Sequence, residues 1–331
     1  MSGARLPGPL AARVSRGLPD PPEGFEWRGA SGLFICSRPD ATTMILASLG
    51  AVGGALPPDV ARLLGTEGGS VESLPDAAAR ARPAGGGRGA VARIAFEDGT
   101  SAILKRYRRG GIARRFLPSL FVRWDRPLAE IQVAEAARRA GAPVAEPLAA
   151  LFTDGRLLHA AFLVTRELPD RVALSAALRR AGEGDAQRLL AEAASAARMC
   201  HDAGLVHGDL NLGNLLVAPP AGAGGRKGPR QGAVVIDLDR ASFRPEGASV
   251  SERFANLSRL ARSHEKIFGT RGPWGPDPAR RIVEAYAAGD AILRATMIAL
   301  LPAHRRAMRL HRFGWKLTGS GSRKRGRTPI P

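Results

Sequence analysis

Three oxygen-bearing side chains in the second half of the chain have types and a spacing that could do chemistry. Asp209 lies two residues after His207 in a stretch with apolar flanks, and Asn214 follows Asp209 five residues later. A further apolar run, residues 233–236, leads directly into Asp237. A carboxylate can accept a proton from a hydroxyl, while an amide oxygen and a second carboxylate can hold Mg²⁺ on a nucleotide. The residues therefore predict a base at Asp209 and a metal site at Asn214 and Asp237.

The same order, His-x-Asp-x-x-x-x-Asn followed by a metal-binding Asp, is typical of the catalytic loop of kinases. A strand–loop–strand pair followed by another strand would bring the three side chains to one end of a small sheet. Ordinary turns also collect His, Asp and Asn, because these side chains bond to nearby backbone. We favour the catalytic interpretation, because the His, the Asp, the Asn and the downstream Asp all occur in the expected order with strand-like segments between them. Asp239 could assist the metal, or it could pair with Arg240 instead.

A glycine-rich segment and a predicted hairpin precede this loop. Two strand-like runs, residues 91–96 and 101–107, are joined by a Glu-Asp-Gly-Thr connection, which indicates a hairpin. Gly87 and Gly89 lie just before the first run, where backbone N–H groups can approach phosphates. Lys105 falls on the second run, where kinases place the lysine that contacts the α- and β-phosphates. Glycine-rich linkers are common, so the order of these features ahead of the loop is what favours nucleotide binding.

A helix predicted to begin at Asp125 and to end at Gly141 supplies a partner for Lys105. Asp125 is a candidate N-cap, and a proline follows early in the helix. Glu130 in the first turn could simply favour the helix N-terminus through the helix dipole. In kinases, however, the helix after the lysine strand supplies the glutamate that pairs with that lysine. Glu135 is the competing candidate, and we favour Glu130.

Further signals place a hinge and the helices of a second lobe. Residues 165–169 interrupt the strand pattern after two more strand-like runs, and we interpret them as the hinge between lobes. Glu167 lies in this segment, where backbone groups could bond the edge of an adenine. Residues 186–203 have helical spacing and end at Gly204, directly before the catalytic loop. Residues 252–304 contain three more helical runs.

These elements predict an α+β fold with two lobes. Residues 25–168 are expected to form a small, mostly antiparallel β lobe with one key helix, whose nucleotide-binding core begins at about residue 80. Residues 169–318 are expected to form a larger, helical catalytic lobe. The N-terminal residues 1–24 and the basic residues 319–331 are expected to be disordered. Residues 218–232, rich in Pro, Gly and basic residues, indicate a surface insertion.

The charge of the chain restricts its partners. A formal net charge of +19 favours polyanions, which include nucleic acid, an anionic membrane and a phosphorylated substrate. No zinc-finger spacing or aromatic–basic RNA-binding signature occurs, so we expect no nucleic acid partner.

Cys36 and Cys200 stand in unrelated contexts, which fits a reducing cytoplasm. The most apolar run, residues 44–56, is too short and too rich in glycine to span a bilayer. We therefore expect a soluble protein that could lie on a membrane surface.

With these residues assembled, the sequence resembles the lipopolysaccharide kinase family, the Kdo kinase and heptose kinase group with a protein-kinase-like fold. Its basic Tyr-Arg-Arg-Gly-Gly and Asn-Leu-x-Arg-Leu-x-Arg-Ser runs are more discriminating than His-Gly-Asp, which aminoglycoside and choline-type kinases share. The resemblance extends over residues 80 to 270, approximately. The matching segments are Gly87-Arg88-Gly89, Leu104 to Gly111, Arg126 with Glu130, His207 to Asn211 with Asn214, Ile236 to Arg240, and Asn256 to Ser263 with Lys266.

The resemblance implies that ATP phosphorylates a sugar hydroxyl, of Kdo or heptose, in the inner core of lipopolysaccharide. Asp209 would deprotonate the hydroxyl and Asn211 would help at the transferring group, while Lys105 would steady the phosphates of an ATP that carries Mg²⁺. The implied partner is an anionic glycolipid acceptor of the lipid A–core type, reached from the cytoplasmic face of the inner membrane. The alternatives are a small-molecule kinase of the aminoglycoside or choline type, a protein kinase, and a non-catalytic nucleotide-binding relative.

Overall fold

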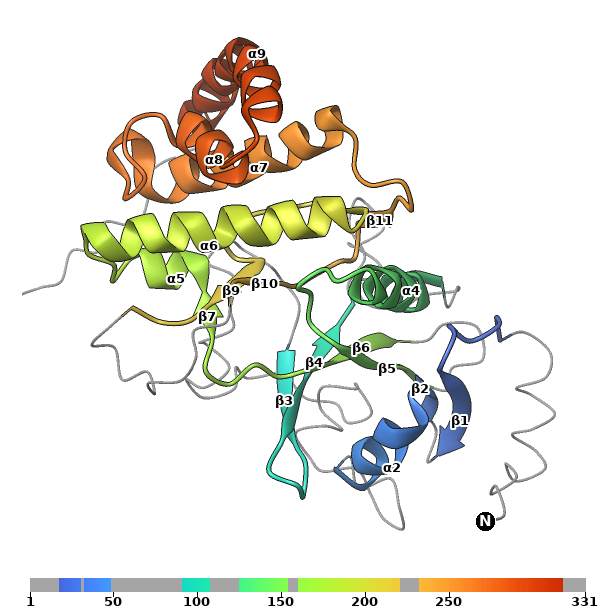
Figure 1. Cartoon of the computed structure of the whole chain (residues 1–331). Coiled ribbons are helices and arrows are strands. Elements are labelled where there is room, and N and C mark those ends of the chain that lie inside the picture. Colours follow the sequence, from blue (N-terminus) through green and yellow to red (C-terminus); the bar gives the residue numbers. More distant parts are fainter. Residues whose placement is uncertain are drawn as a thin grey trace, which may run out of the picture. The chain divides into compact units, whose positions relative to one another are not determined.

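The chain divides into two compact units. The computed structural model describes residues 18–30, 33–48, 91–107, 125–153, 160–220 and 232–317. The first unit ends at Pro169 and the second begins at Asp170, except that residues Ala140–Val144 belong to the second unit. Figure 1 labels the helices and strands of both units.

A six-stranded antiparallel sheet forms the framework of the first unit, in the order β1-β2-β5-β6-β4-β3. Two helices accompany the sheet in the described residues, α2 (Pro39–Ser48) and α4 (Asp125–Arg139). The strands are β1 (Glu26–Ala30), β2 (Leu33–Ser37), β3 (Val91–Ala95), β4 (Ser101–Arg106), β5 (Pro147–Thr153) and β6 (Ala161–Arg166).

The two faces of this sheet carry separate hydrophobic clusters, because successive strand residues point to opposite faces. Ile35 of β2 and Leu104 of β4 pack in a cluster with residues of α2. Phe34 of β2 and Tyr107, just after β4, pack in the other cluster with residues of α4. Figure 1 shows α2 and α4 on opposite sides of the sheet. The alternation therefore places Lys105, the neighbour of Leu104, on the face that α4 covers.

The second unit is mainly helical, with short strands around the predicted catalytic loop. Helix α8 packs against both α6 and α7, and the short strands form the sheets β10-β9-β7 and β11-β8. The helices are α5 (Leu174–Leu178), α6 (Glu183–Asp202), α7 (Val250–Phe268), the 3₁₀ helix η3 (Gly269–Arg271), α8 (Pro278–Tyr286) and α9 (Ala291–Leu317). The strands are β7 (Val172–Ala173), β8 (Leu205–Val206), β9 (Leu215–Val217), β10 (Val234–Val235) and β11 (Ser242–Phe243).

The segment that leaves α4 crosses to the second unit, which the sequence pattern did not indicate. Val235 of β10 donates its backbone N–H to Pro143 O at 2.8 Å, and Val144 forms an isolated parallel bridge with Val235. Residues 140–144 thus extend the backbone pairing of β10, which leads directly into Asp237. The crossing was not predictable from periodicity, because this segment is too short to show any.

The expected α+β class is confirmed by this combination of an antiparallel sheet unit and a helical unit. Helices α2 and α5 were missed because they are short and carry little helical periodicity. Residues 18–24 of the N-terminal segment are described, and Pro19 O in that segment accepts the indole N–H of Trp27 in β1 at 2.9 Å. Gly87 and Gly89 lie outside the described residues. So do residues 1–17, 221–231 and 319–331 of the segments expected to be disordered or inserted.

No helix in the described part of the chain is long and apolar enough to cross a membrane.

Gly204 joins α6 to the strand that leads into the catalytic loop. Two features require glycine at this position, its backbone conformation and the close approach of another segment. Its φ is +89°, and a Cβ atom there would lie 1.9 Å from Arg244 O. The carbonyl oxygen of Gly204 also accepts the backbone N–H of Arg244 at 2.7 Å, which holds the two segments together.

We expect Gly204→Ala to lower the free energy of unfolding by more than the matched variant Gly141→Ala. Gly141 has a similar φ of +87°, but a Cβ atom there would meet nothing within 4 Å. Gly141→Ala should cost about 1–2 kcal/mol of left-handed strain. Gly204→Ala should cost about 1–3 kcal/mol more, because the new Cβ atom would overlap with Arg244 O. Urea unfolding of both variants measures the difference, and equal losses would show that the Arg244 contact is relaxed easily.

Candidate active site

Lys105 and Glu130 form an ion pair in the first unit. Lys105 projects from β4 toward α4, and its Nζ lies 3.5 Å from Glu130 Oε2. Glu130 is only 5% exposed, and the hydroxyl of Tyr107 donates a hydrogen bond to the same carboxylate oxygen. A buried carboxylate needs such partners, because an unpaired charge away from water is costly. The pair therefore fixes the lysine ammonium at one position on the strand.

The ring of Tyr107 gathers a second cation beside this pair. Lys105 Nζ lies 5.0 Å from the centroid of the Tyr107 ring, and the guanidinium of Arg126 lies 5.3 Å from it. The negative face of an aromatic ring attracts cations at these distances. Two positive groups are thus concentrated around Glu130 and Tyr107, which is the type of environment that favours phosphate groups.

Glu135, the competing partner for Lys105, makes different contacts. Its Oε1 lies 3.0 Å from Arg138 Nη1 and 3.5 Å from Arg38 Nη1. Of the two glutamates, the structure therefore brings Glu130 to Lys105 and uses Glu135 to join α4 to the segment after β2.

Glu167 is held by the sheet of the first unit. Its backbone N–H donates to Ser101 O at 2.8 Å, and its carboxylate accepts hydrogen bonds from Arg93 Nε at 2.5 Å and from the Ser101 hydroxyl. The N–H is therefore engaged in sheet pairing. Any adenine contact at Glu167 would have to use its carbonyl group.

His207 organises the predicted catalytic loop in the second unit. Its Nδ1 lies 2.9 Å from the backbone N–H of Asp209, and its Nε2 lies 3.1 Å from Ile236 O. A backbone N–H can only donate, so Nδ1 is an acceptor and the proton of the neutral ring is on Nε2. The imidazole, 3% exposed, therefore connects the backbone of Asp209 to the residue before Asp237.

Asn214 ties the end of the loop to its beginning. Its side-chain Nδ2 donates to Asp209 O at 2.9 Å, and its backbone oxygen accepts the N–H of Ile236 at 2.9 Å. The side chain is 2% exposed, so this hydrogen bond fixes which way the amide points. Together with His207, these contacts bring the backbone of Asp209, Asn214 and Asp237 into one cluster.

Asn211 contacts Asp209 itself. Its Nδ2 donates to Asp209 O at 3.0 Å and to the carboxylate Oδ2 at 3.3 Å, while its Oδ1 accepts the N–H of Gly213 at 2.8 Å. The side chain that was expected to help at the transferring group thus orients the carboxylate of Asp209 in this structure.

The backbone at two positions of this cluster is unusual. Asp237 has a φ of +65°, and it is the one non-glycine residue with positive φ in the described segments. Residues held in this region store conformational strain and often occur at functional sites. A Cβ atom at Gly208 would lie 2.2 Å from Arg240 O, so only glycine fits between His207 and Asp209. The chain after β10 therefore passes very close to the loop.

Helix α7 holds the loop through two side chains whose roles were not predicted. Asn256 Oδ1 accepts the backbone N–H of His207 at 3.0 Å, and Ser263 Oγ accepts that of Leu212 at 3.2 Å. The two residues are seven positions apart, about two helical turns, so they lie on one face of α7. This spacing within the Asn-Leu-x-Arg-Leu-x-Arg-Ser run was the sequence signal that could have identified them.

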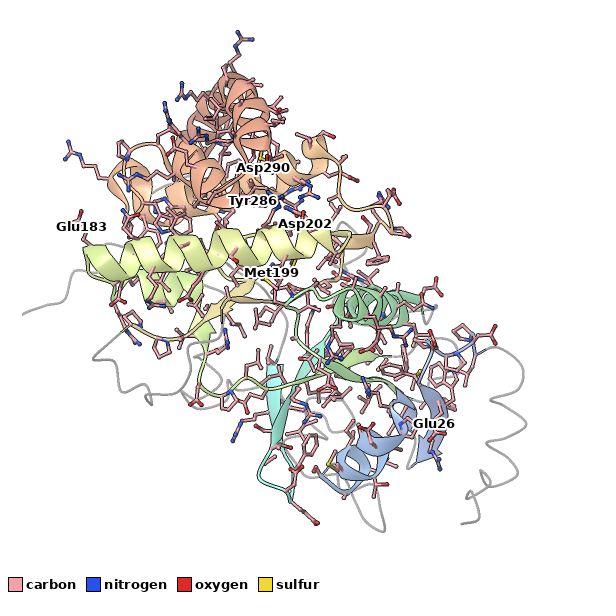
Figure 2. The ribbon with its side chains drawn as sticks, in the orientation of Figure 1. Glu26, Glu183, Met199, Asp202, Tyr286 and Asp290 are labelled. Atoms are coloured by element: carbon pink, nitrogen blue, oxygen red, sulfur yellow. The ribbon has the colours of Figure 1, made fainter. Side chains whose placement is uncertain are left out.

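His201 connects α6 to the same asparagine. Its Nε2 lies 3.3 Å from Asn256 Oδ1, and its Nδ1 lies 2.9 Å from the hydroxyl of Tyr286, which is labelled in Figure 2. Burial lowers the pKa of His201 to about 4, so the ring is neutral near pH 7. Burial likewise raises the pKa of Tyr286 to about 12, so its hydroxyl keeps its proton. Both groups therefore act as fixed hydrogen-bonding links.

The oxygen atoms of this cluster fit a magnesium–nucleotide complex. No group of three or more His, Cys, Asp or Glu side chains among the described residues could hold a metal ion alone. Mg²⁺ bound with a nucleotide needs fewer protein ligands, because phosphates and waters supply the remaining oxygens. Asn214 uses its amide nitrogen for Asp209 O, so its amide oxygen is the atom that suits a metal. Asp237 would supply the carboxylate of such a pair.

We expect Glu130→Gln to weaken the binding of a fluorescent ATP analogue, and the matched variant Glu135→Gln to leave it unchanged. Removing the charge of Glu130 leaves Lys105 without the carboxylate that fixes it. The loss of a hydrogen bond to a charged group, about 1.5–3 kcal/mol, corresponds to a weakening of about tenfold or more. Equal effects of the two variants, measured by titration, would contradict this role of Glu130.

We expect Asn256→Ala to accelerate amide hydrogen exchange at residues 207–212, because the N–H of His207 loses its buried acceptor. Ser263→Ala should have a smaller effect that is centred on Leu212. Ser258→Ala on the same helix is the matched control, since no side-chain hydrogen bond of Ser258 is found in the described structure. Unchanged exchange in both variants, measured by mass spectrometry, would show that α7 does not hold the loop.

Comparisons with known proteins place these features in a family. A search of curated proteins finds no match. The chain is similar to a solved structure of WaaP in complex with acyl carrier protein, at 24% identity and a TM-score of 0.39, over 67% of this chain and 87% of that one. It is also similar to the amicoumacin kinase hAmiN in complex with AMP-PNP, Ca²⁺ and Ami, at 13% identity and a TM-score of 0.42, over 65% of this chain and 73% of that one.

The family comparison covers more than half of the sequence and includes every described residue of the candidate site. The family model of the Lipopolysaccharide kinase (Kdo/WaaP) family matches residues 79–286. The chain therefore belongs to the lipopolysaccharide kinase (Kdo/WaaP) family and is a phosphotransferase that acts on a sugar hydroxyl.

Proposed function

We propose that this kinase transfers the γ-phosphoryl group of ATP to a hydroxyl of a sugar, Kdo or heptose, in the inner core of lipopolysaccharide. Membership of the family supports the reaction class. The observation that carries the assignment to residues is the hydrogen-bonded loop in which His207, Asn211 and Asn214 all contact Asp209. These contacts hold the backbone of Asp209, and Asn211 also contacts its exposed carboxylate, which supports a role for that carboxylate in the reaction.

Asp209 acts as the general base in this proposal. Its side chain is exposed, and Asn211 Nδ2 contacts its Oδ2 at 3.3 Å. As the acceptor oxygen forms its bond to the γ-phosphorus, Asp209 takes the hydroxyl proton. The bond from the γ-phosphorus to the bridging oxygen breaks, and ADP leaves with that electron pair.

Three residues would bind the phosphates and the metal of the nucleotide. Lys105, which Glu130 and Tyr107 position, would contact the α- and β-phosphates, and Asn214 and Asp237 would hold Mg²⁺ through oxygen atoms. When bound, ATP supplies the phosphoryl group and Mg²⁺ neutralises part of its charge. Asn211 serves by orienting the carboxylate of Asp209, as its hydrogen bonds indicate.

An anionic glycolipid of the lipid A–core type is the proposed acceptor, met at the cytoplasmic face of the inner membrane. The net charge of +19 supports this choice, because anionic lipid surfaces attract basic proteins. A kinase for cationic small molecules would instead be expected to present acidic residues to its substrate. The acceptor is therefore the part of the proposal that an assay must decide.

We expect Asp209→Asn to reduce kcat for phosphoryl transfer from radiolabelled ATP to purified lipid A–core by about a hundredfold to ten-thousandfold, the usual contribution of a general base. Glu246→Gln, an exposed carboxylate of the same unit, should leave kcat unchanged. Parallel reactions with an aminoglycoside and with a generic protein should remain unlabelled. Full turnover by Asp209→Asn would refute the role of Asp209, and label on another acceptor class would refute the proposed substrate.

A further inference from the structure

Three cationic residues form one line along α7. Arg259, Arg262 and Lys266 are spaced at i, i+3 and i+7, so their side chains leave the helix on one side. We call these three residues the α7 stripe. Asn256 and Ser263, which hold the catalytic loop, flank Arg259 along the same helix at i−3 and i+4. The stripe therefore runs beside the helix face that the loop contacts.

Arg262 lies within electrostatic range of the proposed base. Burial is the main cause that lowers the pKa of Arg262, and repulsion from Arg259 adds to it, while the carboxylate of Asp209 acts in the opposite direction. The adjacent residue, Ser263, bonds the N–H of Leu212 in the same loop at 3.2 Å. The hydrogen bond of Ser263 and the electrostatic influence on Arg262 thus both place this part of the stripe beside the loop that contains Asp209.

Arg259 and Lys266 of the stripe differ from the other cations near α7 in their ion pairs. Arg253 lies 2.5 Å from Asp202, and Arg244 lies 3.3 Å from Glu252. Within the described ranges, no acidic side chain lies within 4.0 Å of the charged groups of Arg259 or Lys266. Two neighbouring arginines that repel each other gain from binding an anion.

We infer that the α7 stripe binds an anionic group of the acceptor, either a phosphate or a sugar carboxylate. It would thereby select an alcohol that carries such a group close to the hydroxyl that is phosphorylated. Arginine suits both anions, because its planar guanidinium donates two parallel hydrogen bonds to a phosphate or a carboxylate. The inference rests on the proposed function, since it takes Asp209 as the base that the acceptor hydroxyl must reach.

The location of the stripe favours the acceptor over the nucleotide. The base must contact the acceptor hydroxyl directly, so a cation in electrostatic range of Asp209 is close to the acceptor as well. The nucleotide is already assigned other groups, namely Lys105, Asn214 and Asp237. A role for the stripe in nucleotide binding would show as a loss of ATP affinity, which the experiment measures separately.

The test uses equilibrium binding in the full-length Asp209→Asn background, where turnover does not interfere. The probe is deacylated lipid A–core, and the variant adds Arg259→Gln and Arg262→Gln. The matched control adds Arg294→Gln and Arg306→Gln, which remove the same charge from exposed positions on α9. We expect the stripe variant to bind the probe about tenfold or more weakly than the control, from the loss of charge-assisted hydrogen bonds.

Affinity for an ATP analogue should be the same in the stripe variant, the control and the Asp209→Asn parent. A loss of ATP affinity in the stripe variant alone would overturn the inference, as would equal weakening of the probe in the stripe variant and the control. Absence of probe binding by the parent would also overturn it. Arg262→Lys, which retains the charge without the planar fork, should recover part of the lost affinity, and unfolding curves confirm that each variant is folded.

Two modified probes distinguish the possible sources of the anion. If the stripe binds a phosphate, dephosphorylated lipid A–core should bind the variant and the control equally. If the stripe binds a carboxylate, a probe whose carboxyl groups have been reduced should bind the stripe variant and the control equally. If the stripe variant still bound both modified probes more weakly than the control did, the inference would be contradicted.

Turnover by the chain with Asp209 intact separates this inference from the proposed function. If that chain transferred no phosphate to lipid A–core although binding depended on the stripe, only the proposed function would be refuted. If transfer were normal and Arg259→Gln with Arg262→Gln left the KM for the acceptor unchanged, only the inference about the stripe would be refuted.

Discussion

The hydrogen bond from the backbone N–H of His207 to Oδ1 of Asn256 is the contact on which the second unit's candidate site depends. The loop from 207 to 214 is entered by a strand of only two residues, β8, and must present an exposed carboxylate in a fixed position. Backbone pairing alone is too limited to do this. Asn256 on α7 fixes the start of the loop, His207 carries that order to Asp209 and Ile236, and Asn214 closes the loop on Asp209 O. Neutral, buried groups thus position the backbone of the loop that carries the proposed functional oxygens.

The first unit meets a comparable requirement with charge instead. The alternation of β4 sends Leu104 into the core on the side of α2 and Lys105 toward α4. Glu130 is buried there, and its negative charge is compensated by Lys105 and by the hydroxyl of Tyr107. Removing one partner of such a pair leaves a buried charge uncompensated, which is strongly destabilising. The pair therefore fixes the position of Lys105 through the cost of leaving Glu130 alone.

Local spacing was sufficient to find much of this arrangement. The α+β class and the hairpin of β3 and β4 follow from periods of two and 3.6 residues. The pairing of Lys105 with Glu130 was expected from the kinase pattern, with Glu135 as the alternative. The contacts of Asn256 and Ser263 join residues that are 49 and 51 positions apart, and periodicity says nothing about such pairs. The same limit applies to the N–H of Glu167, which pairs with β4. The positive φ of Asp237 depends on how tightly the chain turns after β10, which residue type alone does not reveal.

In the proposed function, Asn214 and Asp237 hold the metal of ATP, and Asp209 is left to act on the acceptor. Anomalous diffraction from crystals grown with Mn²⁺ and a non-hydrolysable ATP analogue tests this most directly. We predict a manganese peak within bonding distance of Asn214 Oδ1 and the Asp237 carboxylate, with the Asp209 carboxylate outside the coordination sphere. A metal held by Asp209, or one that neither Asn214 nor Asp237 contacts, would contradict it.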